Sequence, residues 1–496
     1  MAFILLLPST ASYRRSSQCI SLSLTVTGCP TLPSVLSTTH VTIMSSWLPS
    51  CLYPMYERLT GRRVWSETQQ LLSLQWASSE ELQARSKAKL RALLRHAYGH
   101  TGYYRDLFRC AGLTLDDIRS PEDFAVIPVT TKRALQANDL HRVLADNLPA
   151  ERRWPARTTG STGFPLEFYS DAGAQDARAA SLDFFRIWAG ITPTDSGIVL
   201  ANPGHQEHSY PVREGSRGLL TGRRTYYLSV PDVTLTTFCE TVCSVSTYFL
   251  QGYPSHVARL VREVERQGIR LPAYPKVFFN NSEIVSPFEA EQITHGLRCP
   301  VVEHYESVEF QSMAQSCPDN PTMLHVNSES VLLEIVNEKG MPALPGERGR
   351  VIVTDLHNYV MPFIRYDLED SAVAAGPCPC GRGFPALARL EGRSSEHIRT
   401  SEGHLVTAAI LGEALFVRKR FAACVVEYQA LQTDLHAIAL KIVPSELFDR
   451  QTEGALRACV SEIFGPDMQV ALEIVDQIPR EASGKRLLIK SQISPS

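Results

Sequence analysis

A strand–helix–strand pattern between residues 276 and 304 constrains the fold of this chain more than any other feature. Val277–Phe279 is a short apolar run, and Val301–His304 begins with two valines; both have the length of strands. Between them, Ser286-Pro287-Phe288-Glu289 supplies an N-cap serine, a proline at the first helical position and a glutamate that completes a capping box. We therefore predict a β-α-β unit in an open α/β sheet, with the helix ending near Leu297.

Acidic residues follow both strands of this unit. The turn Asn280–Glu283 comes after the first strand, and Tyr305–Glu309 comes after the second. Ligands of open α/β sheets bind beyond the carboxyl ends of the strands, so Glu283 and Glu309 are predicted to share one edge. Two carboxylates there can hold a Mg²⁺ ion that bridges to phosphate oxygens. The alternative is that the two glutamates lie on solvated loops.

A run of small polar residues precedes this region. Each of the six residues in Thr158-Thr159-Gly160-Ser161-Thr162-Gly163 is a glycine or carries a hydroxyl, and the predicted strand Leu166–Tyr169 follows. Such a loop can present backbone N–H groups and hydroxyls to an anion, because glycine lets the backbone approach closely. The run has no lysine and lacks the Walker spacing. A phosphate loop and a plain solvated turn both fit it.

Asp370 is a third acidic candidate. Val351–Thr354 is a predicted strand, and Asp370 lies in the polar segment that comes after it. A carboxylate just past a strand can accept hydrogen bonds from both hydroxyls of a ribose. An aspartate that only caps a strand also fits this pattern.

The last hundred residues form a separate predicted unit. Gly392–Glu396 is a small polar break, after which predicted strands at Val425–Leu431 and Leu435–Val443 precede a helix at 450–464. We therefore predict domains at 51–392 and 393–496. Near the end, Ser483-Gly484-Lys485 is predicted to present a lysine on a loop.

Composition bears on partners and compartment. The net charge of −3 gives no electrostatic case for nucleic acid, and no apolar run approaches the roughly 18 residues of a membrane span. Twelve scattered cysteines suit a reducing compartment, so we expect a cytoplasmic protein. Residues 1–50 are rich in Ser and Thr and lack Asp and Glu. They fit an organellar transit peptide weakly; an unstructured tail, or an over-extended reading frame with its true start at Met44, explains them equally well.

Taken together, these segments resemble the adenylate-forming superfamily of acyl-CoA synthetases and luciferase-like enzymes, especially its branch of phenylacetate–CoA ligases, CapK-like proteins and deazaflavin-adenylating synthetases. Six segments in the family's order carry the likeness, which covers the chain from about Tyr53 to its end. They are similar to the phosphate loop (Thr158–Pro165), the adenine-side turn (Ser282-Glu283), the Tyr-Gly-x-Thr-Glu segment (Tyr305–Glu309), the ribose site (Tyr366–Asp370), the hinge (Gly392-Arg393) and the catalytic lysine loop (Ser483-Gly484-Lys485).

The resemblance implies a large N-terminal α/β domain, a small mobile α+β C-terminal domain, and ATP-dependent activation of a carboxylic acid. The acid attacks the α-phosphorus to give an acyl-adenylate and pyrophosphate, and CoA then takes the acyl group. Glu309 would bind Mg²⁺, and Lys485 would stabilise the developing charge. The residues that would hold the nucleotide are Thr158, Thr159, Gly160, Ser161, Thr162, Gly163, Ser282, Glu283, Tyr305, Glu306, Asp370 and Arg393.

Departures from the family pattern keep other functions open. Glu306 and Val308 replace the glycine and threonine of Tyr-Gly-x-Thr-Glu, and Ser395 stands where an aspartate or lysine is usual at the hinge. One alternative is transfer of the acyl group to an amine or hydroxyl, or of AMP to a hydroxyl. Another is a nucleotide-binding pseudoenzyme. The sequence does not identify the acid or the oligomeric state, with a homodimer as one option.

Four residues form a predicted zinc site. Cys317 and His325 are separated by seven residues, and Cys378-Pro379-Cys380-Gly381 is a tight turn with two thiols. Cys₃His is a common ligand set for structural Zn²⁺, and members of the resembled branch carry similar Cys/His pairs. Because this spacing is not among the commonest regular ones, free thiols remain the alternative.

Overall fold

A computed structural model describes residues 52–118, 123–158, 165–201, 223–229, 233–245, 247–280, 283–393, 396–400, 405–418, 421–465, 467–480 and 486–493. Residues 1–50 and several predicted site residues lie outside the described residues: Thr159, Gly160, Ser161, Thr162, Gly163, Ser282 and Lys485. Ser395 of the predicted hinge also lies outside them. All described residues belong to one compact unit, Trp47–Ser496.

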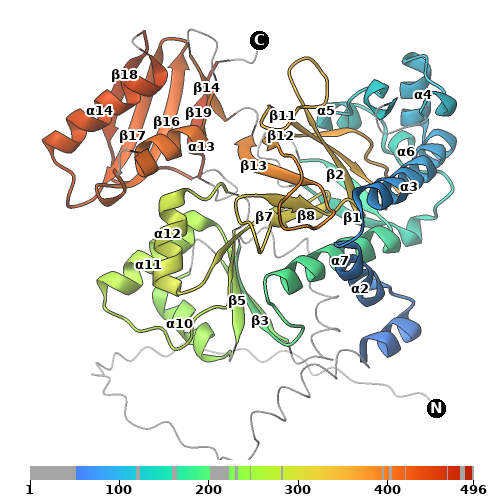
Figure 1. Cartoon of the computed structure of the whole chain (residues 1–496), viewed down its shortest axis with the longest axis horizontal. Coiled ribbons are helices and arrows are strands. Elements are labelled where there is room, and N and C mark those ends of the chain that lie inside the picture. Colours follow the sequence, from blue (N-terminus) through green and yellow to red (C-terminus); the bar gives the residue numbers. More distant parts are fainter. Residues whose placement is uncertain are drawn as a thin grey trace, which may run out of the picture. The chain divides into compact units, whose positions relative to one another are not determined.

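An eleven-stranded mixed sheet organises most of the chain (Figure 1). Its strand order is β10-β11-β12-β13-β9-β8-β7-β6-β5-β3-β4. The parallel half comprises β3 (Ser196–Ala201), β4 (Thr225–Ser229), β5 (Tyr248–Gly252), β6 (Phe278–Asn280) and β7 (Val301–Ser307). The antiparallel half comprises β8 (Gln311–Ser316), β9 (Leu324–Val326), β10 (Val331–Val336), β11 (Arg348–Asp355), β12 (Tyr366–Ala374) and β13 (Ala386–Arg393). The predicted α/β class is confirmed, as is the β-α-β unit, since β6 and β7 pair in parallel.

Both faces of the parallel half carry buried apolar side chains. In β5, Tyr248 and Leu250 join the core beneath α10 (Leu235–Cys243), α11 (Pro254–Arg266) and α12 (Pro287–Leu297). Phe249, between them in sequence, belongs to a separate cluster with Phe279. This alternation follows from the two-residue repeat of a strand, and burial on both faces explains why β5 begins with three apolar residues.

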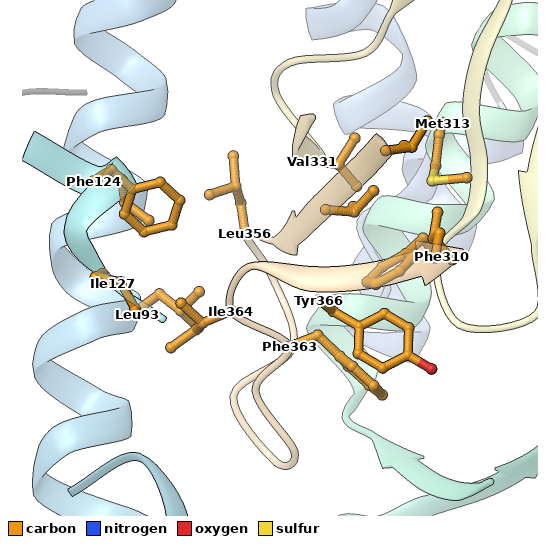
Figure 2. Close-up of a cluster of buried hydrophobic side chains, with 14 of the residues drawn as sticks. Leu93, Phe124, Ile127, Phe310, Met313, Val331, Leu356, Phe363, Ile364 and Tyr366 are labelled. Atoms are coloured by element: carbon orange, nitrogen blue, oxygen red, sulfur yellow. The ribbon is translucent and has the colours of Figure 1, made fainter. Parts of the chain in front are cut away.

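A second group of helices packs on the antiparallel half. The elements are α2 (Val64–Leu74), α3 (Ser79–His100), α4 (Gly102–Cys110), α5 (Lys132–Gln136), α6 (Leu140–Val143) and α7 (Ala172–Trp188). Ser78 caps α3 by accepting a hydrogen bond from the N–H of Glu81 at 3.2 Å. Figure 2 shows part of the resulting core, where Leu93 of α3 lies near Ile364 and the ring of Tyr366 lies beside Phe363. This core fixes the positions of β12 and of the turn between β7 and β8.

The C-terminal residues have a sheet and a hydrophobic core of their own. The elements are β14 (His397–Arg399), β15 (Leu405–Thr407), α13 (Ala408–Gly412), β16 (Val425–Asp434), β17 (Ala437–Pro444), α14 (Arg450–Phe464), β18 (Gln469–Ile474) and β19 (Ile489–Ser491). Four of these strands pair in the order β18-β17-β16-β19, and α14 contacts β18. The strands and helix predicted here from the sequence are confirmed within a few residues. None of the helices in the described part of the chain combines the length and apolar character that crossing a membrane requires.

Candidate functional site

Glu309 lies in the hairpin turn that joins the two halves of the sheet. Ser307 of β7 pairs with Gln311 of β8, which leaves three residues in the turn. Gln311 has φ 59°, and the N–H of Phe310 donates to Ser307 Oγ at 3.1 Å. A three-residue turn followed by a left-handed residue is a standard hairpin geometry. Because the ring of Phe310 packs in the core against Phe363, the turn has little freedom to move Glu309.

The Glu309 carboxylate is buried beside two cations. The Tyr366 hydroxyl donates to Glu309 Oε1 at 3.4 Å. Burial raises the pKa of Glu309, and the charges of Arg393 and Lys132 offset that effect only in part. Among the residues that the structure describes, none forms an ion pair with Glu309 at contact distance, so its buried carboxylate can accept a metal cation.

Asp370 lies inside strand β12, so the prediction that it follows a strand is wrong. Asp367 pairs with Ile352 of β11 and Ser371 pairs with Arg350, which leaves three residues of β12 opposite one of β11. Glu369, at the centre of this bulge, has φ 61°. Bulges of this kind redirect side chains and occur next to active sites. The bulge depends on pairing with β11, which no local sequence pattern predicts.

Asp370 has two predicted site residues as partners, one through a hydrogen bond and one through an ion pair. The Tyr305 hydroxyl donates to Asp370 Oδ2 at 2.7 Å, and Arg393 Nε lies 3.3 Å from Oδ1. Arg393 is the cross-strand partner of Asp370 between β13 and β12, which explains the ion pair. Burial strongly raises the pKa of Tyr305, so the phenol stays protonated and donates to the carboxylate. We call Tyr305, Glu309, Asp370, Arg393 and Lys132 the carboxylate site.

Lys132 is a site residue that the sequence analysis did not identify. Burial lowers its pKa, and the charges of Glu309 and Glu369 counteract that effect. Its segment is held on the sheet by Thr130, whose N–H and carbonyl pair with Arg365 and Asp367 at 2.8 and 2.9 Å. This pairing spans more than 230 residues of sequence. The local sequence therefore indicates only a lysine at the start of a short helix.

Thr158 lies at the base of the predicted phosphate loop and connects its two ends. Strands β1 (Trp154–Arg157) and β2 (Glu167–Ser170) form an antiparallel pair on either side of the loop. Beyond it, Thr158 Oγ1 accepts from the N–H of Leu166 at 2.8 Å. Gln136 of α5 donates to the carbonyl of Pro165 at 3.1 Å. Helix α5 therefore carries Lys132 at one end and contacts the end of the loop at the other.

Glu283 and Glu306 have partners other than Asp370: Glu283 contacts Ser255 and Arg486, and Glu306 contacts His304. Glu306 Oε2 lies 3.6 Å from His304 Nε2, whereas Tyr305 contacts Asp370. Neighbouring residues of a strand point to opposite faces, which accounts for this separation. Burial raises the pKa of Tyr253, and the charges of Glu283 and Glu306 raise it further.

The four predicted zinc ligands lie together. We call Cys317, His325, Cys378 and Cys380 the Cys/His cluster; their ligand atoms all lie within 4.8 Å of one another. Cys317 Sγ lies 3.9 Å from Cys378 Sγ, and Cys380 Sγ lies 3.3 Å from His325 Nε2. A tetrahedral Zn²⁺ with Zn–S distances of 2.3 Å places its sulfur ligands about 3.8 Å apart. The donor set and its spacing therefore fit a zinc ion.

Surrounding residues orient these ligands. His325 Nδ1 lies 2.9 Å from the carbonyl of Phe384, so Nδ1 carries the proton and Nε2 faces Cys380. The guanidinium of Arg382 lies 4.6 Å from the ring centre of Trp76, and the backbone N–H of Arg382 donates to Cys380 Sγ at 3.4 Å. Burial raises the pKa of Cys317 to about 11, so binding a metal there would have to displace a proton.

Comparisons with known proteins agree with these observations. The family model of the CapK C-terminal domain matches residues 398–492. Protein CapK of Staphylococcus aureus is 23% identical over 341 residues, which cover 66% of this chain and 72% of CapK. Phenylacetate-coenzyme A ligase of Escherichia coli K12 is 25% identical over 344 residues, which cover 65% of this chain and 74% of the ligase.

Solved structures extend the similarity over most of the chain. The crystal structure of a 2-hydroxyisobutyryl-CoA ligase, in the postadenylation state with an acyl-AMP, superposes with a TM-score of 0.70 at 17% identity. The match covers 84% of this chain and 91% of that ligase. At this identity the likeness establishes the fold. The chain therefore has the fold of this CoA ligase and, in line with the resemblance noted in its sequence, is similar in sequence to CapK and to a phenylacetate-coenzyme A ligase.

Proposed function

We propose that this protein activates a carboxylic acid with ATP and transfers the acyl group to CoA. The observation that carries the proposal is the carboxylate site, in which Glu309, Asp370 and Arg393 gather beside Lys132. The carboxylic acid attacks the α-phosphorus of ATP, the bond to pyrophosphate breaks, and the sulfur of CoA later displaces AMP. The relatives named phenylacetate-coenzyme A ligase and the acyl-AMP complex of the structural neighbour support this reaction class.

Within this proposal each charged residue has a role. Asp370 would receive the ribose hydroxyls, with Arg393 and the Tyr305 hydroxyl holding its carboxylate in place. Glu309 would bind Mg²⁺, whose charge would stabilise the phosphate oxygens. Lys132 would add positive charge near the phosphates, because it lies beside Glu309 on a helix that contacts the end of the loop 158–166.

Pyrophosphate release tests the reaction class. Purified protein is incubated with ATP, Mg²⁺ and a panel of aromatic and aliphatic acids, with and without CoA. Acid-dependent pyrophosphate together with a CoA thioester is the expected result. Acid-dependent pyrophosphate release without any thioester, together with an acyl-adenylate that hydroxylamine traps as a hydroxamate, would instead favour an amine or hydroxyl acceptor. If none of the acids in the panel causes pyrophosphate release, the result would contradict the proposal and favour a pseudoenzyme.

We also infer that the Cys/His cluster binds one structural Zn²⁺. Three thiols and one imidazole with the separations described above support this inference, and three of the four residues are buried. Elemental analysis of protein purified without added metal should give about one zinc per chain. Zinc-free protein that retains full thermal stability would contradict the inference.

The division into domains at 51–392 and 393–496 remains our proposal. It is supported by the separate C-terminal core and by the match of residues 398–492 to a known domain. Mobility of the C-terminal domain would allow one set of catalytic residues to serve adenylation and another to serve transfer.

A further inference from the structure

Two carboxylates of the predicted domain 51–392 hold Arg486, which directly follows the segment 481–485 in sequence. The backbone N–H of Arg486 donates to Glu283 Oε1 at 2.8 Å, and its guanidinium donates to Glu289 Oε1 at 2.6 Å. The side chains of Arg486 and Glu289 are 5% and 7% exposed. Such a buried, hydrogen-bonded ion pair fixes geometry more strongly than a surface pair.

Arg480, on the other side of this segment, is held in the same region. It donates to Ser255 Oγ of helix α11 at 2.8 Å and lies 3.8 Å from Glu283 Oε1. Glu283 Oε2 also accepts from the backbone N–H of Ser255 at 3.3 Å. Glu283 was predicted to contact the nucleotide or a cation, but here its two oxygens have protein partners. Both residues that flank 481–485 therefore contact the region between α11 and α12.

Glu289 links this contact to the start of α12. Its Oε2 accepts from the N–H and hydroxyl of Ser286 at 3.1 and 2.8 Å, which closes the capping box, while Oε1 faces Arg486. Burial opposes ionisation of Glu289, but Arg486 and the Ser286 hydrogen bonds outweigh burial, so its pKa lies below the ordinary value. The contact is therefore charged on both sides.

The rest of the contact includes an aromatic pair and two buried polar atoms without a partner among the described residues. Phe288 stacks on Phe416 with ring centres 6.1 Å apart. Arg486 Nε and the Tyr428 hydroxyl are buried without a hydrogen-bond partner among the described residues.

We propose that Glu283 and Glu289 are positioning residues that dock the C-terminal domain for adenylate formation, and that the Glu289–Arg486 pair separates before transfer to CoA. This proposal rests on the proposed ligase function. Its motivation is that the five residues between Arg480 and Arg486 include Lys485, the predicted adenylation lysine. Docking Arg480 and Arg486 on the predicted domain 51–392 would favour adenylate formation over transfer to CoA.

Glu289→Gln tests the proposal because glutamine can keep the capping box but removes the ion pair. Phenylacetate serves as the probe acid for pyrophosphate release, and synthetic phenylacetyl-adenylate with CoA serves for transfer. We expect adenylation to fall by roughly tenfold or more, with transfer unchanged or faster. The matched control is Glu329→Gln, which removes another buried acid that pairs with Arg85 and Lys89. Equal loss in both half-reactions of Glu289→Gln would overturn the proposal.

Hydrogen exchange measured by mass spectrometry separates this proposal from the ligase function. Peptides covering 284–297 and 486–493 should exchange faster in Glu289→Gln and not in Glu329→Gln, whether or not any acid is activated. Unchanged exchange in both peptides would overturn the docking role even if the ligase reaction is confirmed. Should Glu289→Gln fail to fold, Glu289→Gln with Arg486→Met removes both charges and leaves no unpaired buried ion. That double variant should show the same split between half-reactions, and an equal loss in both would again overturn the proposal.

Discussion

The Cys/His cluster and the carboxylate site lie at opposite ends of strand β8 and are built on different principles. Cys317 follows the end of β8, and its partner ligands lie close enough to share one ion. Glu309 precedes the start of β8 and lies among charges that burial holds away from their usual pKa values. The first arrangement can be satisfied by a metal alone. The second leaves a carboxylate and an ammonium destabilised by burial, which is typical of a binding or catalytic site.

This difference predicts separable effects of substitution. Removing a ligand of the Cys/His cluster should lower stability and leave the chemistry of folded protein intact. Removing a charge from the carboxylate site should abolish chemistry and leave stability nearly unchanged. A variant that affects both properties would show that the two ends of β8 are coupled.

Glu309→Gln should have the largest effect on activity. The substitution keeps the shape of the side chain and removes the charge that would hold Mg²⁺, so adenylation should be abolished. The melting temperature should stay within a few degrees, because burial already opposes ionisation of Glu309. Pyrophosphate release at several Mg²⁺ concentrations measures the first effect, and differential scanning fluorimetry measures the second.

Two further results would test the Glu309 assignment. A raised carboxylate pKa means that the protonated fraction grows at mildly acidic pH, so the wild type should need more Mg²⁺ as the pH falls. Near-normal activity of Glu309→Gln at limiting Mg²⁺ would contradict the metal-binding role. Glu329→Gln, a buried acid outside the site, should retain activity.

Lys485→Ala should reduce acyl-adenylate formation by roughly 10²–10³-fold, the scale for losing one charge-stabilising donor. Transfer from a supplied acyl-adenylate to CoA should survive, because the lysine is expected to act only while pyrophosphate departs. Lys490→Ala, an exposed lysine of the same domain, is the control and should change neither step. Equal loss of both half-reactions would contradict alternation of the C-terminal domain.

Local features of the fold followed from the sequence with good accuracy. Ser286 and Glu289 were predicted to form a capping box, and both hydrogen bonds are present at the start of α12. The Cys/His cluster was also predicted in full, because an unusual set of soft ligands has few structural explanations. These predictions needed only short-range geometry or distinctive chemistry.

Features that depend on distant pairing were missed or misplaced. Asp370 was predicted to follow a strand. It lies in the bulge of β12, which arises from the pairing of β12 with β11 and is not visible in the local sequence. Lys132 was overlooked because Thr130 attaches its segment to β12 more than 230 residues later. The contact between Glu283 and the backbone of Arg486 was not predicted, because no local pattern could pair the two residues; the nucleotide or cation contact of Glu283 stays a prediction. A side chain's identity suggests its chemistry, whereas its partner is set by the whole fold.

Cys378→Ser should lower thermal stability and leave the adenylation activity of the folded protein unchanged. Zinc content should fall from about one per chain to near zero. The melting temperature should fall by roughly 5 °C or more, because the remaining buried thiols and the imidazole would lose the zinc ion that they share. Adenylation by the fraction that remains folded should be unchanged at 20 °C. The control is Cys110→Ser, an exposed free cysteine, which should change neither zinc nor stability. Normal zinc content in Cys378→Ser would remove this residue from the ligand set.

Tyr305→Phe should have the smallest effect, and it tests how finely the carboxylate site is tuned. The change removes one hydrogen bond to Asp370, whose side chain is 17% exposed, so water can replace the lost donor. A loss of about 1 kcal/mol corresponds to roughly fivefold, which should appear in the KM for ATP rather than in kcat. Tyr366→Phe is the matched control, because its 3.4 Å contact with Glu309 is at the limit of a hydrogen bond and should cost less. If Tyr305→Phe instead lowers kcat and leaves KM unchanged, Tyr305 and Asp370 act on the reacting phosphate rather than on the ribose. Zinc content should be normal in both variants, because neither residue belongs to the Cys/His cluster.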